Sequence, residues 1–68
     1  MMIVLNGEPR EALTGMTLAA LIAAEGIEPE RRGIAVALDG EVVPRSAWET
    51  ALLAEGARIE VLQAVAGG

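Results

Sequence analysis

The chain contains no histidine, cysteine, tyrosine or lysine, and Trp48 is its only aromatic residue. These absences remove the usual general bases, nucleophiles, Schiff-base formers and soft metal ligands, so that carboxylates and hydroxyls carry most of the remaining polar chemistry. Without cysteine the fold cannot be held by disulfides, and its core must be built from aliphatic side chains. We therefore expect a protein that is not an enzyme and that binds no metal and no cofactor.

Positive charge is also scarce, with five arginines against ten acidic residues and a formal net charge of −5. Nucleic-acid binding needs a basic surface and often stacking aromatics, so the composition argues against it and favours a basic protein partner. The apolar run at residues 1–5 is too short for a membrane span and lacks the positive flank of a signal peptide. We expect no membrane partner and a cytoplasmic location.

Turn signals divide the chain, whose 68 residues suffice for one domain. Asn6-Gly7 and Asp39-Gly40 each follow a run of β-favouring residues and predict two type I′ hairpins. Between the hairpins, the apolar spacing of the alanine-rich segment 18–25 predicts a helix, with Thr17 as N-cap and Gly26 as its stop.

The second half predicts a short helical turn and a last strand. Ser46 and Glu49 have the spacing of a capping box at the start of that turn, and residues 58–62 alternate as a strand. Trp48 could be a stacking platform for a ligand, but a single aromatic in a small fold is more often a packing plug.

This order of elements predicts a two-layer α+β fold. One main helix would pack on one face of a mixed sheet of four to five strands. The first and last strands would be central if they pair in parallel, because parallel crossovers are right-handed. That is the β-grasp, or ubiquitin-like, topology. We assign residues 1–62 to the β-grasp domain and 63–68 to a flexible C-terminal tail.

The tail ends in Gly67-Gly68. Glycine has no Cβ, so two in succession can follow a passage too narrow for a side chain and leave the terminal carboxylate accessible. At about 3.3 Å per residue, the six tail residues could extend about 20 Å, enough to enter a partner's active site. We predict Gly68 as the reactive position and Val65, Ala66 and Gly67 as the segment that enters the partner.

Several stretches of the chain resemble the ubiquitin-like sulfur carriers, and most closely the ThiS family of thiamine biosynthesis. The resemblance covers nearly the whole length and is strongest in Ile-Val-Leu-Asn-Gly at 3–7, Val-Pro-Arg-Ser-Ala-Trp at 43–48, and the stretch 56–68 that ends in Ala-Gly-Gly. The chain departs from the family in its alanine-rich helix and in lacking the aromatics that relatives often carry near the first and last strands.

The resemblance implies a protein substrate of other enzymes. An adenylating enzyme would activate the Gly68 carboxylate with ATP, and a persulfide sulfur donor would convert it to a thiocarboxylate, a covalent 1-thioglycine. A thiazole synthase would then use this sulfur to build the thiazole ring of thiamine.

If Ile3, Ile59 and Val61 face the helix, the opposite sheet face has no second layer. An apolar patch would lie there, and exposed apolar patches often mark docking sites. We predict this face as the partner-binding surface, formed by Met2, Val4, Ala35, Ala37 and Leu62.

Three other readings stay open. The small subunit of molybdopterin synthase shares the fold, the Gly-Gly end and the thiocarboxylate chemistry. A protein modifier that forms isopeptide bonds would also use such a tail, and a plain β-grasp interaction module would not need it.

Overall fold

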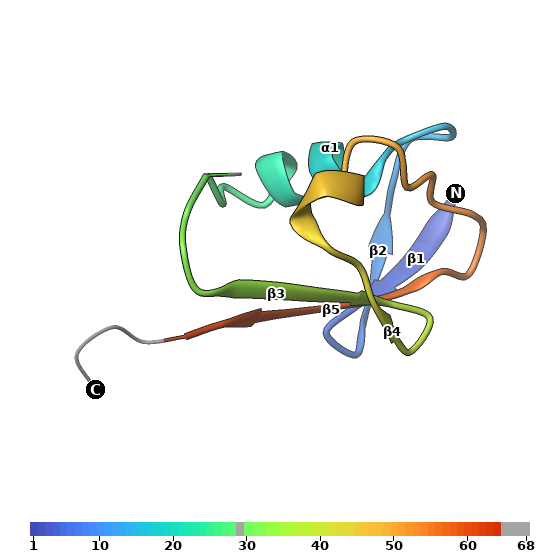
Figure 1. The fold of residues 1–68 in the computed structure, drawn as a ribbon. Helices are drawn as coiled ribbons and strands as arrows, with labels where there is room; N and C mark the ends of the chain where they lie inside the picture. The colour runs from blue at the N-terminus through green and yellow to red at the C-terminus, as the bar shows by residue number, and fades with distance from the viewer. Residues whose placement is uncertain (29, 65–68) are drawn as a thin grey trace.

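The computed structural model describes residues 1–28 and 30–64, which form a sheet and a helical layer (Figure 1). The elements in chain order are β1 (Met2–Leu5), β2 (Glu8–Glu11), α1 (Leu18–Ala24), β3 (Ile34–Leu38), β4 (Glu41–Val42), the 3-10 turn η1 (Arg45–Ala47) and β5 (Arg58–Gln63). The strand order is β2-β1-β5-β3-β4. Strands β1 and β5 are parallel and the other neighbouring pairs are antiparallel. This is the predicted β-grasp arrangement, with the first and last strands side by side.

Both hairpins turn as their dipeptides predict. Asn6 and Gly7 have φ of 49° and 83°, and Asp39 and Gly40 have φ of 50° and 86°, which is the left-handed pair that a type I′ turn requires. The side chains of the two turns also reach β5: Asn6 Oδ1 accepts from the Val61 N–H at 2.8 Å, and Asp39 Oδ1 accepts from the Arg58 N–H at 2.9 Å. Each turn therefore joins its hairpin to the central strand.

Helix α1 begins and ends close to where its capping signals place it. Thr17 Oγ1 accepts from the Ala20 N–H at 3.2 Å, which confirms Thr17 as the N-cap. At the other end Gly26 has φ of 81°, and the Ile27 N–H donates to the Ile22 carbonyl at 3.2 Å, as in a Schellman motif. The helix buries its apolar stripe against the sheet, and in Figure 1 both α1 and η1 lie over the same face.

The core lies between the sheet and the helical layer. Its buried residues are Ile3, Leu5, Leu18, Leu21, Ile22, Val36, Trp48, Leu53, Ala57 and Ile59. Trp48 is 3% exposed, and its Nε1 donates to the Val43 carbonyl at 2.9 Å, so its indole N–H is satisfied inside the packing. The prediction of Trp48 as a packing plug is confirmed.

Two local predictions differ from the structure. The capping box at Ser46 and Glu49 is wrong, because Pro44 stands before η1 and no side chain caps the turn. Proline already supplies the φ of −63° that leads into the turn, and η1 is so short that Glu49 lies beyond it. Strand β5 also continues one residue further than predicted, since Gln63 pairs with Ile34.

Candidate functional site: the end of β5 and the uncovered sheet face

The predicted reactive segment follows directly from the central strand. Val65, Ala66, Gly67 and Gly68 lie outside the described residues. The structure does show the part of the chain that carries them, because the Ala64 N–H donates to the Gly33 carbonyl at 2.7 Å. This hydrogen bond extends the β3–β5 ladder one residue beyond the Ile34–Gln63 pair. The backbone is therefore held by the sheet up to Ala64.

Strand β5 is held from both sides. It pairs with β3 along residues 59–63 and with β1 at Arg58 and Ile59. Beyond the end of β1, the Asn6 side chain takes over: besides accepting from the Val61 N–H, its Nδ2 donates to the Val61 carbonyl at 3.4 Å. The side chain thus occupies the place where a longer β1 would have continued the ladder. Strand β5 is therefore held on both sides as far as Val61 and by β3 beyond it.

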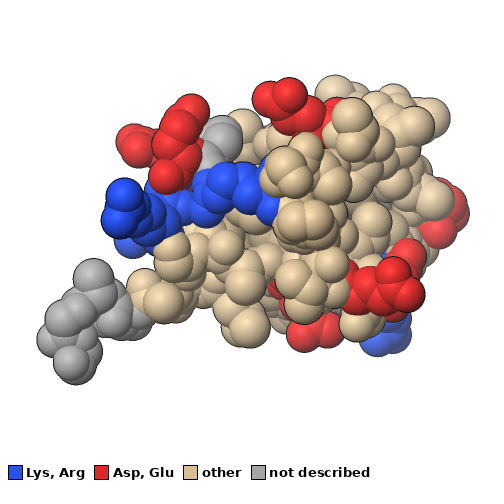
Figure 2. All heavy atoms as spheres, in the orientation of Figure 1, with Lys and Arg blue, Asp and Glu red and all other residues tan. Residues whose placement is uncertain are grey.

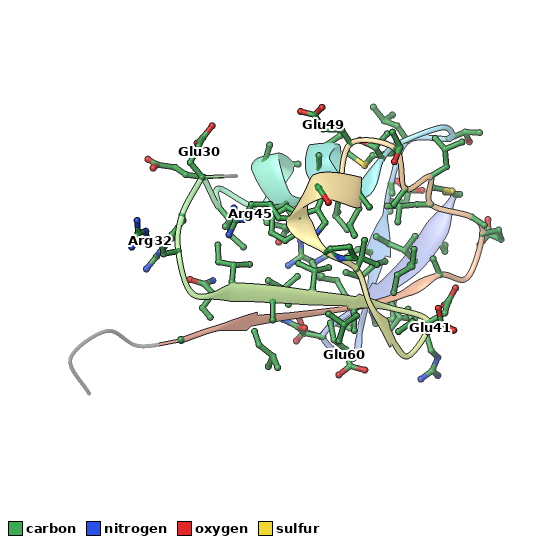
Figure 3. The ribbon with its side chains drawn as sticks, in the orientation of Figure 1. Glu30, Arg32, Glu41, Arg45, Glu49 and Glu60 are labelled. Carbon is green, nitrogen blue, oxygen red and sulfur yellow. The ribbon has the colours of Figure 1, made fainter. Side chains whose placement is uncertain are left out.

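The loop that leads from α1 to β3 brings positive charge to this end of the molecule. Arg31 and Arg32 lie in it, and both are exposed. The Arg45 side chain reaches the same loop, where its Nη2 donates to the Arg31 carbonyl at 2.5 Å. Figure 2 shows these blue side chains gathered on one side, close to Glu residues of the loop, and Figure 3 labels Arg32 and Arg45 among them. Within the described residues the only ion pair lies elsewhere, between Arg10 and Glu25 at 2.7 Å.

The sheet face opposite α1 carries the predicted apolar residues. Burial alternates along β1 and β5 so that Ile3, Leu5 and Ile59 enter the core. The residues that alternate with these point to the other side of the sheet, where Met2 is 43% and Leu62 is 68% exposed. Ala35 is exposed, and Val4 and Ala37 are half-buried. No described helix covers this face (Figure 1). The structure brings Met2, Val4, Ala35, Ala37 and Leu62 onto one uncovered surface, and its role in binding stays a prediction.

Register shows one further member of this face that the sequence reasoning missed. Ala37 pairs with Val42, which is 75% exposed, so Val42 extends the apolar surface onto β4. A two-residue turn at Asp39-Gly40 already implies this pairing, because it sets the Leu38–Glu41 and Ala37–Val42 rungs. Glu60 also pairs with Ala37 and points away from the helical layer (Figure 3), so a carboxylate lies inside the patch.

The described residues contain no group of three or more acidic side chains arranged to hold a metal ion. No helix in residues 1–28 and 30–64 is long and apolar enough to cross a bilayer.

Comparisons with known proteins agree with the fold. The model of the ThiS family matches residues 3–68. The crystal structure of a thiamine biosynthesis protein, ThiS, from Geobacter metallireducens superimposes with a TM-score of 0.83 at 26% identity, covering 100% of both chains. The NMR structure of a thiamine biosynthesis protein from the same organism gives a TM-score of 0.80.

Similar curated proteins are of two lengths. The sulfur carrier protein ThiS of Escherichia coli is 29% identical over 68 residues, which cover 100% of both chains. A thiazole synthase of Magnetococcus marinus is 40% identical over the same 68 residues, and one of Paramagnetospirillum magneticum is 32% identical. The chain spans only 20% of the length of each of these two synthases. Since the family model covers almost every residue and the fold agrees throughout, the chain belongs to the ThiS family.

Proposed function

We propose that this chain is a sulfur carrier of thiamine biosynthesis, and that the carboxylate of Gly68 is its reactive group. The observation that carries the proposal is the match to the ThiS family through Gly68, at the end of a strand that the sheet holds as far as Ala64. Four residues follow Ala64, and at about 3.3 Å each they can reach about 13 Å beyond the body. Gly67 and Gly68 suit a narrow passage because they carry no side chain.

The chemistry requires activation first. A carboxylate is a poor electrophile because its negative charge is delocalised and repels a sulfur nucleophile. A partner enzyme would transfer AMP from ATP to the Gly68 carboxylate, releasing pyrophosphate and forming an acyl-adenylate. A persulfide on a donor protein would then attack the carbonyl carbon and expel AMP, giving an acyl disulfide. A cysteine thiol of the partner enzyme would then attack the donor-side sulfur of this S–S bond, leaving the thiocarboxylate on Gly68 and a disulfide between the partner and donor cysteines.

In this scheme the chain supplies the reactive terminus and a surface that partners recognise. Its own side chains offer carboxylates, hydroxyls and arginines, none of which is needed for the steps above. Partner enzymes would dock on the uncovered face formed by Met2, Val4, Ala35, Ala37 and Leu62. The tail, Val65 to Gly68, would enter the partner's active site from the edge of that face.

A thiazole synthase is the acceptor that the relatives favour. Two proteins named thiazole synthase each contain a segment that aligns with the whole of this chain and makes up a fifth of their length. A carrier segment within the synthase chain keeps sulfur donor and acceptor at high local concentration. Such relatives support a functional pairing of this chain with a thiazole synthase.

The experiment is intact-mass spectrometry of the purified protein after incubation with ATP, a ThiS-adenylating enzyme and a persulfide donor. We expect one oxygen of Gly68 to be replaced by sulfur. Fragmentation must locate the change, because oxidation of any of the three methionines adds nearly the same mass. A chain shortened by Gly67 and Gly68 is the matched control and should stay unmodified. If several competent enzyme pairs leave Gly68 unchanged, the proposal is wrong.

A further inference from the structure

Arg45 makes two contacts that together require an arginine. Its Cζ lies 4.6 Å from the centroid of the Trp48 ring, and its Nη2 donates to the Arg31 carbonyl. A guanidinium can stack with its face and donate hydrogen bonds with its edge at the same time, whereas a lysine ammonium is a point charge without a plane. In Figure 3 the labelled Arg45 lies between η1 and the loop that leads to β3.

The platform under Arg45 is fixed. Trp48 is 3% exposed, its Nε1 is bonded to the Val43 carbonyl, and its own carbonyl accepts from the Ala19 N–H of α1 at 3.0 Å. The Val43 carbonyl therefore holds the indole, and α1 holds the Trp48 backbone. Because the ring is fixed, it also fixes the position of the guanidinium that stacks on it.

The Arg31 carbonyl, which accepts the hydrogen bond from Arg45, lies close in sequence to the residue that holds Ala64. Arg31 is two residues before Gly33, whose carbonyl accepts from the Ala64 N–H, the last described hydrogen bond of β5. The fit at this pair is close, since a Cβ on Gly33 would lie 3.2 Å from the Cβ of Ala64. Gly33 also has φ of 78°, a conformation that other residues rarely adopt. Only Arg32 separates the Arg31 carbonyl from Gly33, the hydrogen-bond partner of Ala64.

The loop has few other restraints among the described residues. Besides the Arg45 contact, the hydrogen bonds that hold residues 30–33 are the turn bond from the Arg31 N–H to the Glu28 carbonyl, at 3.0 Å, and the Gly33–Ala64 bond itself. The turn bond stays within the loop and does not attach it to the body. Apart from the Gly33–Ala64 bond, Arg45 supplies the described hydrogen bond that attaches residues 30–33 to the body.

We propose that Arg45 is a positioning residue for the reactive tail. By tying the Arg31 carbonyl to the buried Trp48 ring, it holds the loop whose Gly33 fixes Ala64, and so sets the direction in which the chain leaves the sheet. This role rests on the proposed function, which requires the tail to be aimed at a partner's active site. The effect of Arg45 on the position of Ala64 does not depend on a partner and can be measured in the free protein.

The first test measures solvent exchange of backbone amides by NMR in the free protein. Arg45→Ala should raise the exchange rate of the Ala64 amide about fivefold, the loss expected for one hydrogen bond of ordinary net strength. The Val4 amide, which donates to the Ala57 carbonyl on the far side of β5, reports global opening and should be unchanged. Arg45→Lys should recover only part of the protection, because it can donate but cannot stack.

Arg32→Ala is the matched control. It removes the same charge at the same end of the molecule, and the Arg32 side chain forms no hydrogen bond or ion pair within the described residues. It should leave Ala64 exchange as in the wild type. Gly33→Ala disturbs the Gly33–Ala64 pair directly, so it should expose the Ala64 amide to solvent exchange even though Arg45 is intact. Equal Ala64 exchange in wild type and Arg45→Ala, with both folded, would overturn the inference.

The second test uses the adenylating enzyme and measures pyrophosphate release against carrier concentration. A misdirected tail on an intact docking face should lower kcat about fivefold and leave KM within about twofold. A KM effect with unchanged kcat would instead place Arg45 in docking and overturn the positioning role. If wild-type protein is not adenylated at all, the proposed function fails, and the amide exchange of the free protein still decides whether Arg45 holds Ala64.

Discussion

Replacing Leu62 by alanine should weaken partner docking without destabilising the fold. Leu62 is 68% exposed on the uncovered face, near the end of β5 that leads into the tail, so a partner that covers it removes about two thirds of its side chain from water. Full burial of a leucine contributes about 1.5–3 kcal/mol, which scales here to about 1–2 kcal/mol. Alanine keeps only the Cβ methyl, so most of this gain is lost. We expect KM for adenylation to rise about 5- to 30-fold with kcat unchanged.

Leu52 provides the matched control for that substitution. It is 66% exposed, almost the same fraction as Leu62, but it lies in the segment after η1, where its backbone forms a bridge with Thr17. Leu52→Ala should therefore leave KM unchanged. Both variants should unfold within about 0.5 kcal/mol of the wild type, since neither side chain belongs to the core. Equal KM values for the two variants would refute the assignment of the uncovered face as the docking surface.

Two further predictions concern stability. Asn6→Ala removes the hydrogen bonds to the Val61 backbone and places alanine at φ of 49°, so we expect a loss of about 2 kcal/mol, or about 10 °C in Tm. Asn6→Asp keeps the acceptor for the Val61 N–H and should cost less than half as much; equal losses in thermal unfolding would show that this bond contributes nothing. Ile59→Val, at a central position that is 1% exposed, should cost about 0.5–1.5 kcal/mol in urea unfolding with an unchanged m-value. An Ile59→Val variant as stable as wild type would contradict the placement of Ile59 in the packed core.

The parts of the fold that sequence predicts well are those encoded by neighbouring residues. Asn6-Gly7 and Asp39-Gly40 need the left-handed conformation within two positions, and Thr17 and Gly26 act on the helix turn next to them. The central placement of the first and last strands followed from topology rules applied to these local elements. Ser46 failed as a cap because the effect of Pro44, two residues earlier, was stronger than a spacing that only matched a motif.

The candidate site was predictable to a smaller degree. Alternation placed Met2, Val4 and Leu62 on the face away from the helix, where Met2 and Leu62 are exposed and Val4 is half-buried. The contact from Arg45 to the Arg31 carbonyl was invisible, because it joins residues 14 apart through the path of an irregular loop. A pattern in sequence can mark Arg45 and Trp48 as a pair, but only the fold shows what the pair holds.

The position of β5 between β1 and β3 has a mechanical consequence. A partner that draws the C-terminus into a channel pulls along the axis of this strand, parallel to its neighbours. The load is then shared by rungs of both ladders, including Leu5–Ile59 on one side and Val36–Val61 on the other. An edge strand pulled in the same way would be restrained by one neighbour only. Anchored in the middle of the sheet, the tail can sustain tension at its tip while the body that partners recognise keeps its shape.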